Sequence, residues 1–336
     1  MIALHYEARF GLARGAVYKD GRPHLYLEGY ESDSSLAVLG TRSVARLKSR
    51  AGGVTFLALA DNDEAILDTP QGVQLNDGAA VEIEIIAEAR PTSNKLARAR
   101  FIALASGDLR RLSPPLSLKD RLLARARGIF GDAPIEEIPD RDAIDEAYEQ
   151  AANPSGPLSN GGQLWIEATR ALIACDVDAA EAGNLNPGRT FARACNELAV
   201  SDLPRRLRLA NLGGMVVLDL IGKRHDGERL RTLLLDAFAG EVAQVIVAPV
   251  GKFGTLEFVR PWGAAPARDL FPPMRGAIYI MWQAIALSES DRGHAIVIRT
   301  SQAVVDMLKP LIAASRDPLA PMVRLEISTV HEAVYA

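Results

Sequence analysis

Two aspartates, Asp176 and Asp178, end an apolar run in the stretch ALIACDVDAA. If residues 172–177 form a strand, both side chains lie on one face, because successive residues of a strand point to opposite faces. Asp219 closes the apolar run GGMVVLDLI in a similar way. Carboxylates at strand ends of an α/β sheet suit Mg²⁺ or Mn²⁺ together with a phosphate oxygen. Aspartates at this spacing are more often surface residues or caps of turns and helices than metal ligands, so the spacing alone does not establish a metal site.

The elements that would position these aspartates follow a linker-like stretch, PSGPLSNGG, at residues 154–162. LWIEATRALIACDVDA predicts a strand pair, GGMVVLDLI a buried strand, and QVIVAPV and TLEFVR two further strands. TFARACNELAVSDLPRRLRLA and ERLRTLLLDAFAG predict helices. This region therefore predicts an α/β layer.

The remaining chain predicts separate modules. Residues 1–35 predict short strands around a KDGRP turn, and five β-type segments between about 38 and 106 suit a small OB-type barrel. The segment LSLKDRLLARARGIF predicts a basic helix, and residues 276–336 predict helix, strand, helix and strand. Residues 95–127 hold nine Lys or Arg and two Asp, whereas residues 132–149 hold eight acids and one Arg. Two solvent-exposed helix faces of opposite charge would explain this separation of basic and acidic residues without a bound ligand.

The composition excludes several classes of protein. The chain has 336 residues, 48% hydrophobic and 24% charged, with a net charge of −4, so any positive surface for nucleic acid must be local. Two cysteines, Cys175 and Cys195, cannot build a disulfide framework or a CxxC zinc site, and we expect both to be buried. The apolar runs are too short to span a bilayer and the N-terminus is not signal-like, so we expect a cytoplasmic protein without a membrane partner.

Three stretches together resemble the core of the ribonuclease E/G family: NGGQLWIEATRALIACDVDA, NELAVSDLPRRLRLANLGGMVVLDLI and GKFGTLEFVR. That family has a glycine-glycine hairpin, a D-x-N aspartate, an R-L-R-x-x-L-G-G lead-in to a D-F-I-D strand, and an F-G-L strand that ends in T-R. GTRSVARLKSRAGGVTFLALADNDEAILD and SNKLARARFIAL resemble its S1-type OB-fold. MRGAIYIMWQAIALSESDRGHAIVIRTSQAVVDMLKP resembles its small C-terminal domain.

The resemblance implies an α/β multidomain fold, in which an RNase H-like remnant carries an inserted S1-type OB-fold β-barrel and is followed by a DNase I-like α/β subdomain and a small C-terminal α/β domain. The implied domains are the RNase H-like part at 1–35 continued in 135–162, the OB-fold at 36–107, a basic helix or linker in place of the family's 5′ sensor at 108–134, the DNase I-like catalytic subdomain at 163–268 and the C-terminal domain at 275–336.

The resemblance also implies a function: metal-dependent endonucleolytic hydrolysis of single-stranded RNA by metal-activated water, with Mg²⁺ or Mn²⁺ as the cofactor. Asp176 and Asp219 match the family's metal-binding aspartates, and Asp178 matches the asparagine that assists them. The extra charge of Asp178 makes it either a further metal ligand or a source of repulsion for the scissile phosphate.

Several residues match positions that hold RNA. Phe56 matches an aromatic of the OB-fold that packs against RNA, with a core position as the alternative, and Lys95 matches a basic residue of the same module. Arg205, Arg206 and Arg208 are candidates for phosphate contacts or for a solvated helix end. Arg260 matches the arginine of the T-R strand end.

The sequence departs from the family pattern. Ile66 replaces a second aromatic, Gly222 the second aspartate of D-F-I-D, and Gln244 a basic residue. The 5′-phosphate pocket V-R-T-A-G-V-G-K-S has no counterpart, so we expect cleavage independent of a 5′-monophosphate. The C-P-x-C zinc link is replaced by DLFPPMRG at 269–276, so we expect no zinc, and a homodimer would have to form without that link. The alternatives are a catalytically inactive RNA-binding protein of the same fold and an RNA-free scaffold.

Overall fold

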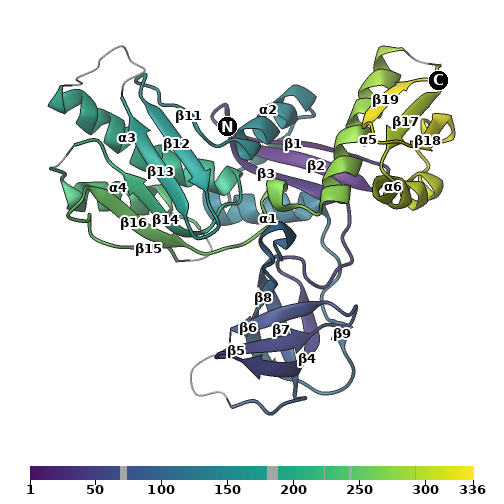
Figure 1. Ribbon diagram of the computed structural model, residues 1–336, viewed down its shortest axis with the longest axis horizontal. Helices are drawn as coiled ribbons and strands as arrows, with labels where there is room; N and C mark the ends of the chain where they lie inside the picture. Colours follow the sequence, from purple (N-terminus) through teal and green to yellow (C-terminus); the bar gives the residue numbers. More distant parts are fainter. Residues whose placement is uncertain (69–73, 180–187, 223, 242–243, 292) are drawn as a thin grey trace.

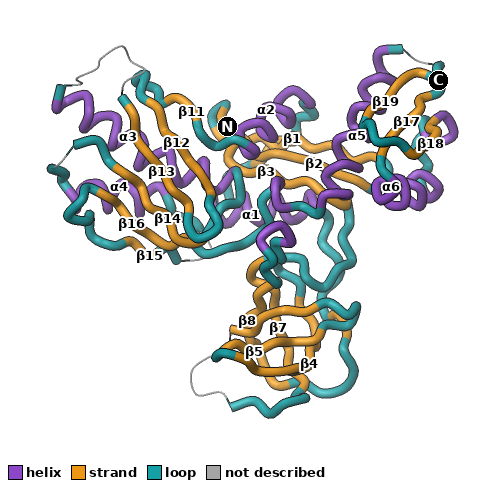
Figure 2. Tube along the Cα trace, viewed as in Figure 1, coloured by secondary structure: helices purple, strands orange, loops and turns teal. Residues whose placement is uncertain are grey.

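The computed structural model describes residues 1–68, 74–179, 188–222, 224–241, 244–291 and 293–336. In Figure 1 the sheet of the N-terminal strands lies at the centre, a β-barrel lies below it, and two α/β bodies lie to its left and right. Figure 2 shows the same arrangement by type of secondary structure. Within the described ranges, no helix combines the length and the apolar character that crossing a bilayer requires.

The central sheet has the strand order β10-β1-β2-β3. Asp20 and Gly21 close the β2–β3 hairpin with φ values of 51° and 76°, which suit a type I′ turn. Helices α1 and α2 cover opposite faces of the sheet: Leu122 of α1 packs with Leu4, and Ile144 of α2 packs with Ala3. The bounds are β1 (Ile2–Arg9), β2 (Leu12–Lys19), β3 (Arg22–Tyr30), β10 (Ile135–Glu137), α1 (Leu118–Phe130) and α2 (Arg141–Ala152).

The barrel confirms the OB-type prediction. Its strands follow the order β5-β6-β8-β7-β4, and a β4–β5 pairing closes the ring. Val81, Ile83 and Ile85 are fully buried, because the alternation in VEIEI directs one face of β7 into the barrel. A short strand, β9, pairs with β4. The bounds are β4 (Arg42–Ala51), β5 (Val54–Ala58), β6 (Glu64–Asp68), β7 (Ala80–Ala87), β8 (Ala97–Leu104) and β9 (Arg110–Arg111).

The α/β sheet on the left of Figure 1 has the order β11-β12-β13-β14-β16-β15. Strands β13 and β14 are parallel, and the other neighbours are antiparallel. Leu203 of α3 and Leu234 of α4 pack into the same core as Leu218 of β14. The bounds are β11 (Gly156–Pro157), β12 (Gln163–Ala168), β13 (Ile173–Asp178), β14 (Gly214–Asp219), β15 (Ile246–Val247), β16 (Thr255–Arg260), α3 (Arg189–Leu209) and α4 (Gly227–Ala237).

Among the described residues, helices cover only one face of this sheet. On the other face Met215, Val259 and Ile246 are 51%, 40% and 68% exposed. The expectation that GGMVVLDLI is a buried strand is therefore wrong for one of its faces, since an apolar run does not reveal which side a sheet leaves open.

The C-terminal body has the strand order β18-β17-β19. Its helix α5 packs on the central sheet, because Phe10 and Leu12 share a core with Ile278 and Met281. The bounds are α5 (Pro272–Ser290), β17 (Ile296–Thr300), α6 (Gln302–Ala314), β18 (Val323–Ile327) and β19 (Glu332–Tyr335). The predicted mixed α/β architecture is thus confirmed together with its barrel. The domain boundaries and the RNase H-like and DNase I-like assignments stay predictions.

Candidate active site

Asp176 and Asp219 lie side by side on adjacent parallel strands. They are Cα partners in the β13–β14 register. Their chain neighbours Cys175, Val177 and Leu218 are buried, so strand alternation places both aspartates on the uncovered face. Adjacent strands are about 4.8 Å apart, which lets the two carboxylates approach a common ligand. Asp178 shares this face two residues further along β13, as its spacing predicts.

The three carboxylates act on one another electrostatically. The pKa of Asp176 is raised, first by partial burial and then by the negative charges of Asp219 and Asp178, while a backbone hydrogen bond at Val177 opposes the rise. A raised pKa means that the ionised form is disfavoured unless positive charge is supplied. A cation above this face would supply that charge.

The donor set fits a magnesium-type ion. The described residues contain no group of three His, Cys, Asp or Glu side chains arranged to hold a metal ion by themselves. Magnesium does not require such a cage, because it keeps several waters and is often held by one or two carboxylates. Asp176 and Asp219 offer this kind of hard oxygen donor on neighbouring strands.

A turn at the end of β14 is held by the buried side chain of Asn196 on α3. Its amide donates to the carbonyl of Ile221 and accepts from the Ile221 N–H, at 3.0 Å in each case. Gly222 follows with a φ of 100°, which residues with a side chain rarely adopt. Glycine therefore suits the backbone of this turn.

A cavity of about 700 Å³ lies at the same end of the sheet. Ile221 and Gly222 line it, together with the first turns of α3 and α4. It is also lined by four arginines, Arg189, Arg193, Arg224 and Arg229. Hydrogen bonds from Arg229 and Arg193 lower the pKa of Glu197 to about 2. Sequence reasoning missed this cluster, because the α3–α4 packing brings together arginines from separate segments.

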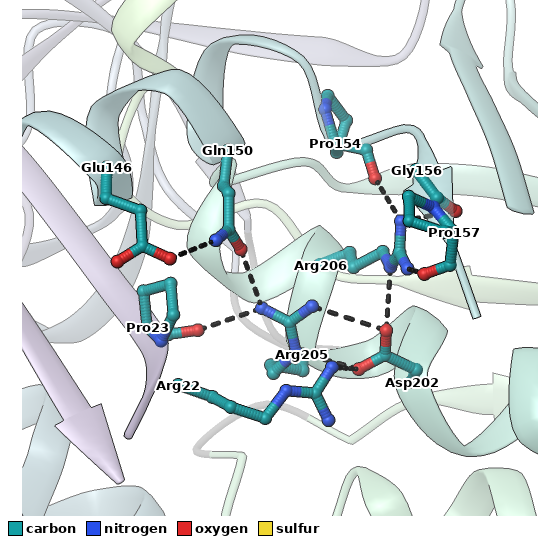
Figure 3. A network of polar contacts seen from close by, with 10 residues as sticks. All are labelled: Arg22, Pro23, Glu146, Gln150, Pro154, Gly156, Pro157, Asp202, Arg205 and Arg206. Carbon is teal, nitrogen blue, oxygen red and sulfur yellow. Dashed lines mark hydrogen bonds and ion pairs between the residues drawn. The ribbon is translucent and has the colours of Figure 1, made fainter. Parts of the chain in front are cut away.

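The arginines that precede β14 are interior residues. Arg205, Arg206 and Arg208 are 7%, 6% and 4% exposed. Asp202 binds Arg205 and Arg206 at N–O distances of 2.7 Å each, and Figure 3 shows it between the two guanidinium groups. A solvated helix end is therefore the wrong description of this segment.

The same arginines link distant parts of the chain. Arg205 donates to the carbonyl of Pro23, and Arg206 donates to the carbonyls of Pro154 and Pro157 (Figure 3). The structure thus uses their donors inside the protein, and the predicted phosphate contacts of these arginines are corrected to structural roles.

Arg208 and Arg260 share one acid. Both bind Glu241, at 3.1 Å and 2.9 Å, and Arg260 also donates to the carbonyl of Leu212. Arg260 is 6% exposed. The predicted RNA contacts of these two arginines are corrected in the same way. Their guanidinium groups are buried and bind acceptors inside the protein, so their role is structural.

The barrel carries its candidate RNA-binding residues on the outside. Phe56 is partly exposed and lies outside the barrel core, whereas its neighbour Leu57 is fully buried. Its Cα partner is Ile66, which in turn is the partner of Arg98. Lys95 is exposed just before β8. The alternative of a core position for Phe56 is therefore wrong.

The chain combines an OB-type barrel, a fold that often binds oligonucleotides, with a separate sheet that carries paired carboxylates. Comparison with known proteins is consistent with this class: residues 129–262 match the model of the Ribonuclease E/G family. The resemblance to that family is therefore confirmed, and the matched region contains both Asp176 and Asp219.

Individual relatives match more locally. The chain is similar to "Ribonuclease E" of Haemophilus influenzae, with 32% identity over 120 residues, and to "Ribonuclease E" of Escherichia coli, with 28% identity over 173 residues. It is also similar to "Ribonuclease G" of Haemophilus influenzae, with 29% identity over 133 residues. These matches cover 35%, 51% and 39% of this chain but only 13%, 15% and 26% of the respective relatives. The chain thus spans less than a third of each of these proteins.

Proposed function

We propose that this protein is a metal-dependent endoribonuclease that hydrolyses single-stranded RNA. The observation that carries the proposal is the register that pairs Asp176 with Asp219 on an uncovered sheet face. Both residues lie in the region that matches the Ribonuclease E/G family, and the similar proteins bear the names ribonuclease E and ribonuclease G.

Each residue of the site has a role in this proposal. Asp176 and Asp219 would hold Mg²⁺ or Mn²⁺, and Asp178, on the same face, would act either as a further ligand or as a charge that repels the phosphate. When bound, the cation supplies a nucleophilic water at neutral pH and neutralises charge on the phosphate. The two carboxylates would orient the cation, and the RNA strand would lie along the uncovered face.

The direct test is incubation with a labelled, unstructured RNA in Mg²⁺, in Mn²⁺ and in chelator. The proposal expects cutting in either metal and none in chelator. Binding without cutting would instead support the inactive RNA-binding protein, which the added charge of Asp178 beside Asp176 favours. Neither binding nor cutting would support the scaffold.

Phe56→Ala is expected to weaken RNA binding by about 1–3 kcal/mol, since it removes a ring on which a base can stack. Ile66→Phe is the matched change, because Ile66 is the Cα partner of Phe56, and a second ring there should strengthen binding. Fluorescence anisotropy of a labelled RNA in chelator measures both affinities. Unchanged affinity in Phe56→Ala would remove the barrel face from the proposed RNA path.

Cleavage is expected to be independent of a 5′-monophosphate. The region between the barrel and α2 contains β9, α1 and β10, and the phosphate-pocket motif has no counterpart in the sequence. Initial rates on RNAs that differ only in a 5′-monophosphate or a 5′-hydroxyl should agree within about twofold, which corresponds to less than about 0.5 kcal/mol. A strong preference for the monophosphate would contradict this expectation.

Three further expectations come from the sequence and stay predictions. They are a cytoplasmic location, the absence of zinc, and pairing of two chains, where it occurs, without a zinc link. Sedimentation with and without chelator tests the last two together.

A further inference from the structure

Trp165 lies on the uncovered face beside the acidic pair. It is the antiparallel Cα partner of Asp176, which is itself the partner of Asp219, so the three residues form one row across β12, β13 and β14. Leu164 and Ile166 on either side of Trp165 are buried, and the indole therefore points away from the core.

The indole of Trp165 is accessible. The side chain is 41% exposed, and among the described residues no aromatic ring or cationic side chain packs against it. The other two tryptophans have partners within the fold: Arg90 lies 3.4 Å from the ring centroid of Trp262, and Arg14 lies 4.8 Å from that of Trp282. Trp165 is thus a partly exposed aromatic surface on which, among the described residues, no ring or cation packs.

We infer that Trp165 is a base-stacking residue of the cleavage site, on which the nucleobase next to the scissile phosphate lies. Directly opposed residues of an antiparallel pair have Cβ atoms roughly 5 Å apart, so the indole begins within one strand spacing of Asp176. A phosphate held at the acidic pair therefore has a neighbouring base within reach of the ring. This inference rests on the proposed function, because it assumes that RNA lies on this face.

The chemistry of the row favours a nucleobase over an apolar protein segment. Asp176, Asp219 and Thr255 continue the row from Trp165, so the ring is bordered by polar groups on that side. Exposed apolar side chains gather instead toward Met215 and its partner Val259, at the other end of β14. A flat, uncharged base stacks on an indole without burying the carboxylates, and such stacking accepts every base.

The test is RNA binding by proteins that do not cut. In an Asp219→Asn background, Trp165→Ala should weaken binding of an unstructured RNA by roughly 5- to 150-fold, whereas Trp165→Phe keeps a ring and most of the affinity. Tyr279→Ala is the matched control, since Tyr279 is an exposed aromatic on α5, and it should leave affinity unchanged. Equal melting temperatures of the variants establish that the fold is intact.

An abasic scan identifies the stacked base. A single abasic nucleotide is placed at each position of the RNA in turn. At one position it should weaken binding to the protein that has Trp165 but not binding to the Trp165→Ala variant. The reason is that removing the base and removing the indole abolish the same contact. RNA should also quench a tryptophan fluorescence component that is missing in Trp165→Phe. Equal affinity of Trp165→Ala and the parent, or an abasic effect of equal size in both, overturns the inference.

The proposed function and this inference fail differently. A wild-type protein that cuts RNA while Trp165→Ala binds and cuts equally well overturns only the stacking role. A protein that neither binds nor cuts RNA overturns the proposed function and the inference with it.

Discussion

Asp176→Asn and Asp219→Asn are each expected to lower metal-dependent cutting of RNA by at least about a thousand-fold. Asparagine keeps the size of the side chain but removes the negative charge that holds the cation. The cation's stabilisation of phosphate charge and of a nucleophilic water is worth several kcal/mol, and each 1.4 kcal/mol changes a rate about tenfold. Initial rates on a labelled, unstructured RNA in Mg²⁺ measure the loss.

Two control variants separate this effect from general damage. Asp236→Asn changes an exposed aspartate on α4 and should leave the rate unchanged. Asp178→Asn keeps the paired carboxylates and removes one of the charges that raise the pKa of Asp176. A proton competes with the cation for Asp176, and a lower pKa weakens that competition. The acidic limb of the activity profile of this variant should therefore lie at lower pH than that of the wild type. Full activity in Asp176→Asn or Asp219→Asn would remove these residues from the cleavage site.

The shared face of Asp176 and Asp178 could be predicted because its signal is local. A period of two residues is visible within a single strand, and it places Asp176 and Asp178 on one face whatever the strand packs against. The barrel follows from similar alternation in β7. The register between β13 and β14 is different: the chain reaches Asp219 only after the crossover through α3, and no pattern within either strand fixes which residues become partners.

The arginines of α3 show why burial was not predicted. A run such as PRRLRL has the same composition whether it faces solvent or a partner. The carbonyl that Arg205 binds belongs to Pro23, 182 residues away, and one that Arg206 binds belongs to Pro154, 52 residues away. Trp165, by contrast, could have been found, because the alternation of LWIE against two buried aliphatic neighbours already directs it outward.

Asp202→Ala is expected to destabilise the protein by about 3–5 kcal/mol, because it leaves the buried guanidinium groups of Arg205 and Arg206 without their shared counter-charge. Both arginines also hold backbone carbonyls outside α3, so the loss should extend to the contacts between α3 and the segments at Pro23 and Pro154. Urea unfolding followed by circular dichroism measures the change in midpoint and free energy.

A surface variant and an acid titration test whether burial is the reason. Glu326→Ala breaks an exposed ion pair with Arg299 and should cost less than about 1 kcal/mol of stability.

Burial alone would raise the pKa of Asp202, but the hydrogen bonds and charges of Arg205 and Arg206 outweigh it and hold that pKa well below its usual value. The carboxylate's contribution is therefore present above the unfolded-state pKa of about 3.9 and is lost as the pH falls toward the folded value. Asp202→Ala should accordingly differ most from the wild type near neutral pH and least in strong acid, and a difference that does not depend on pH would show that packing, not charge, stabilises this junction.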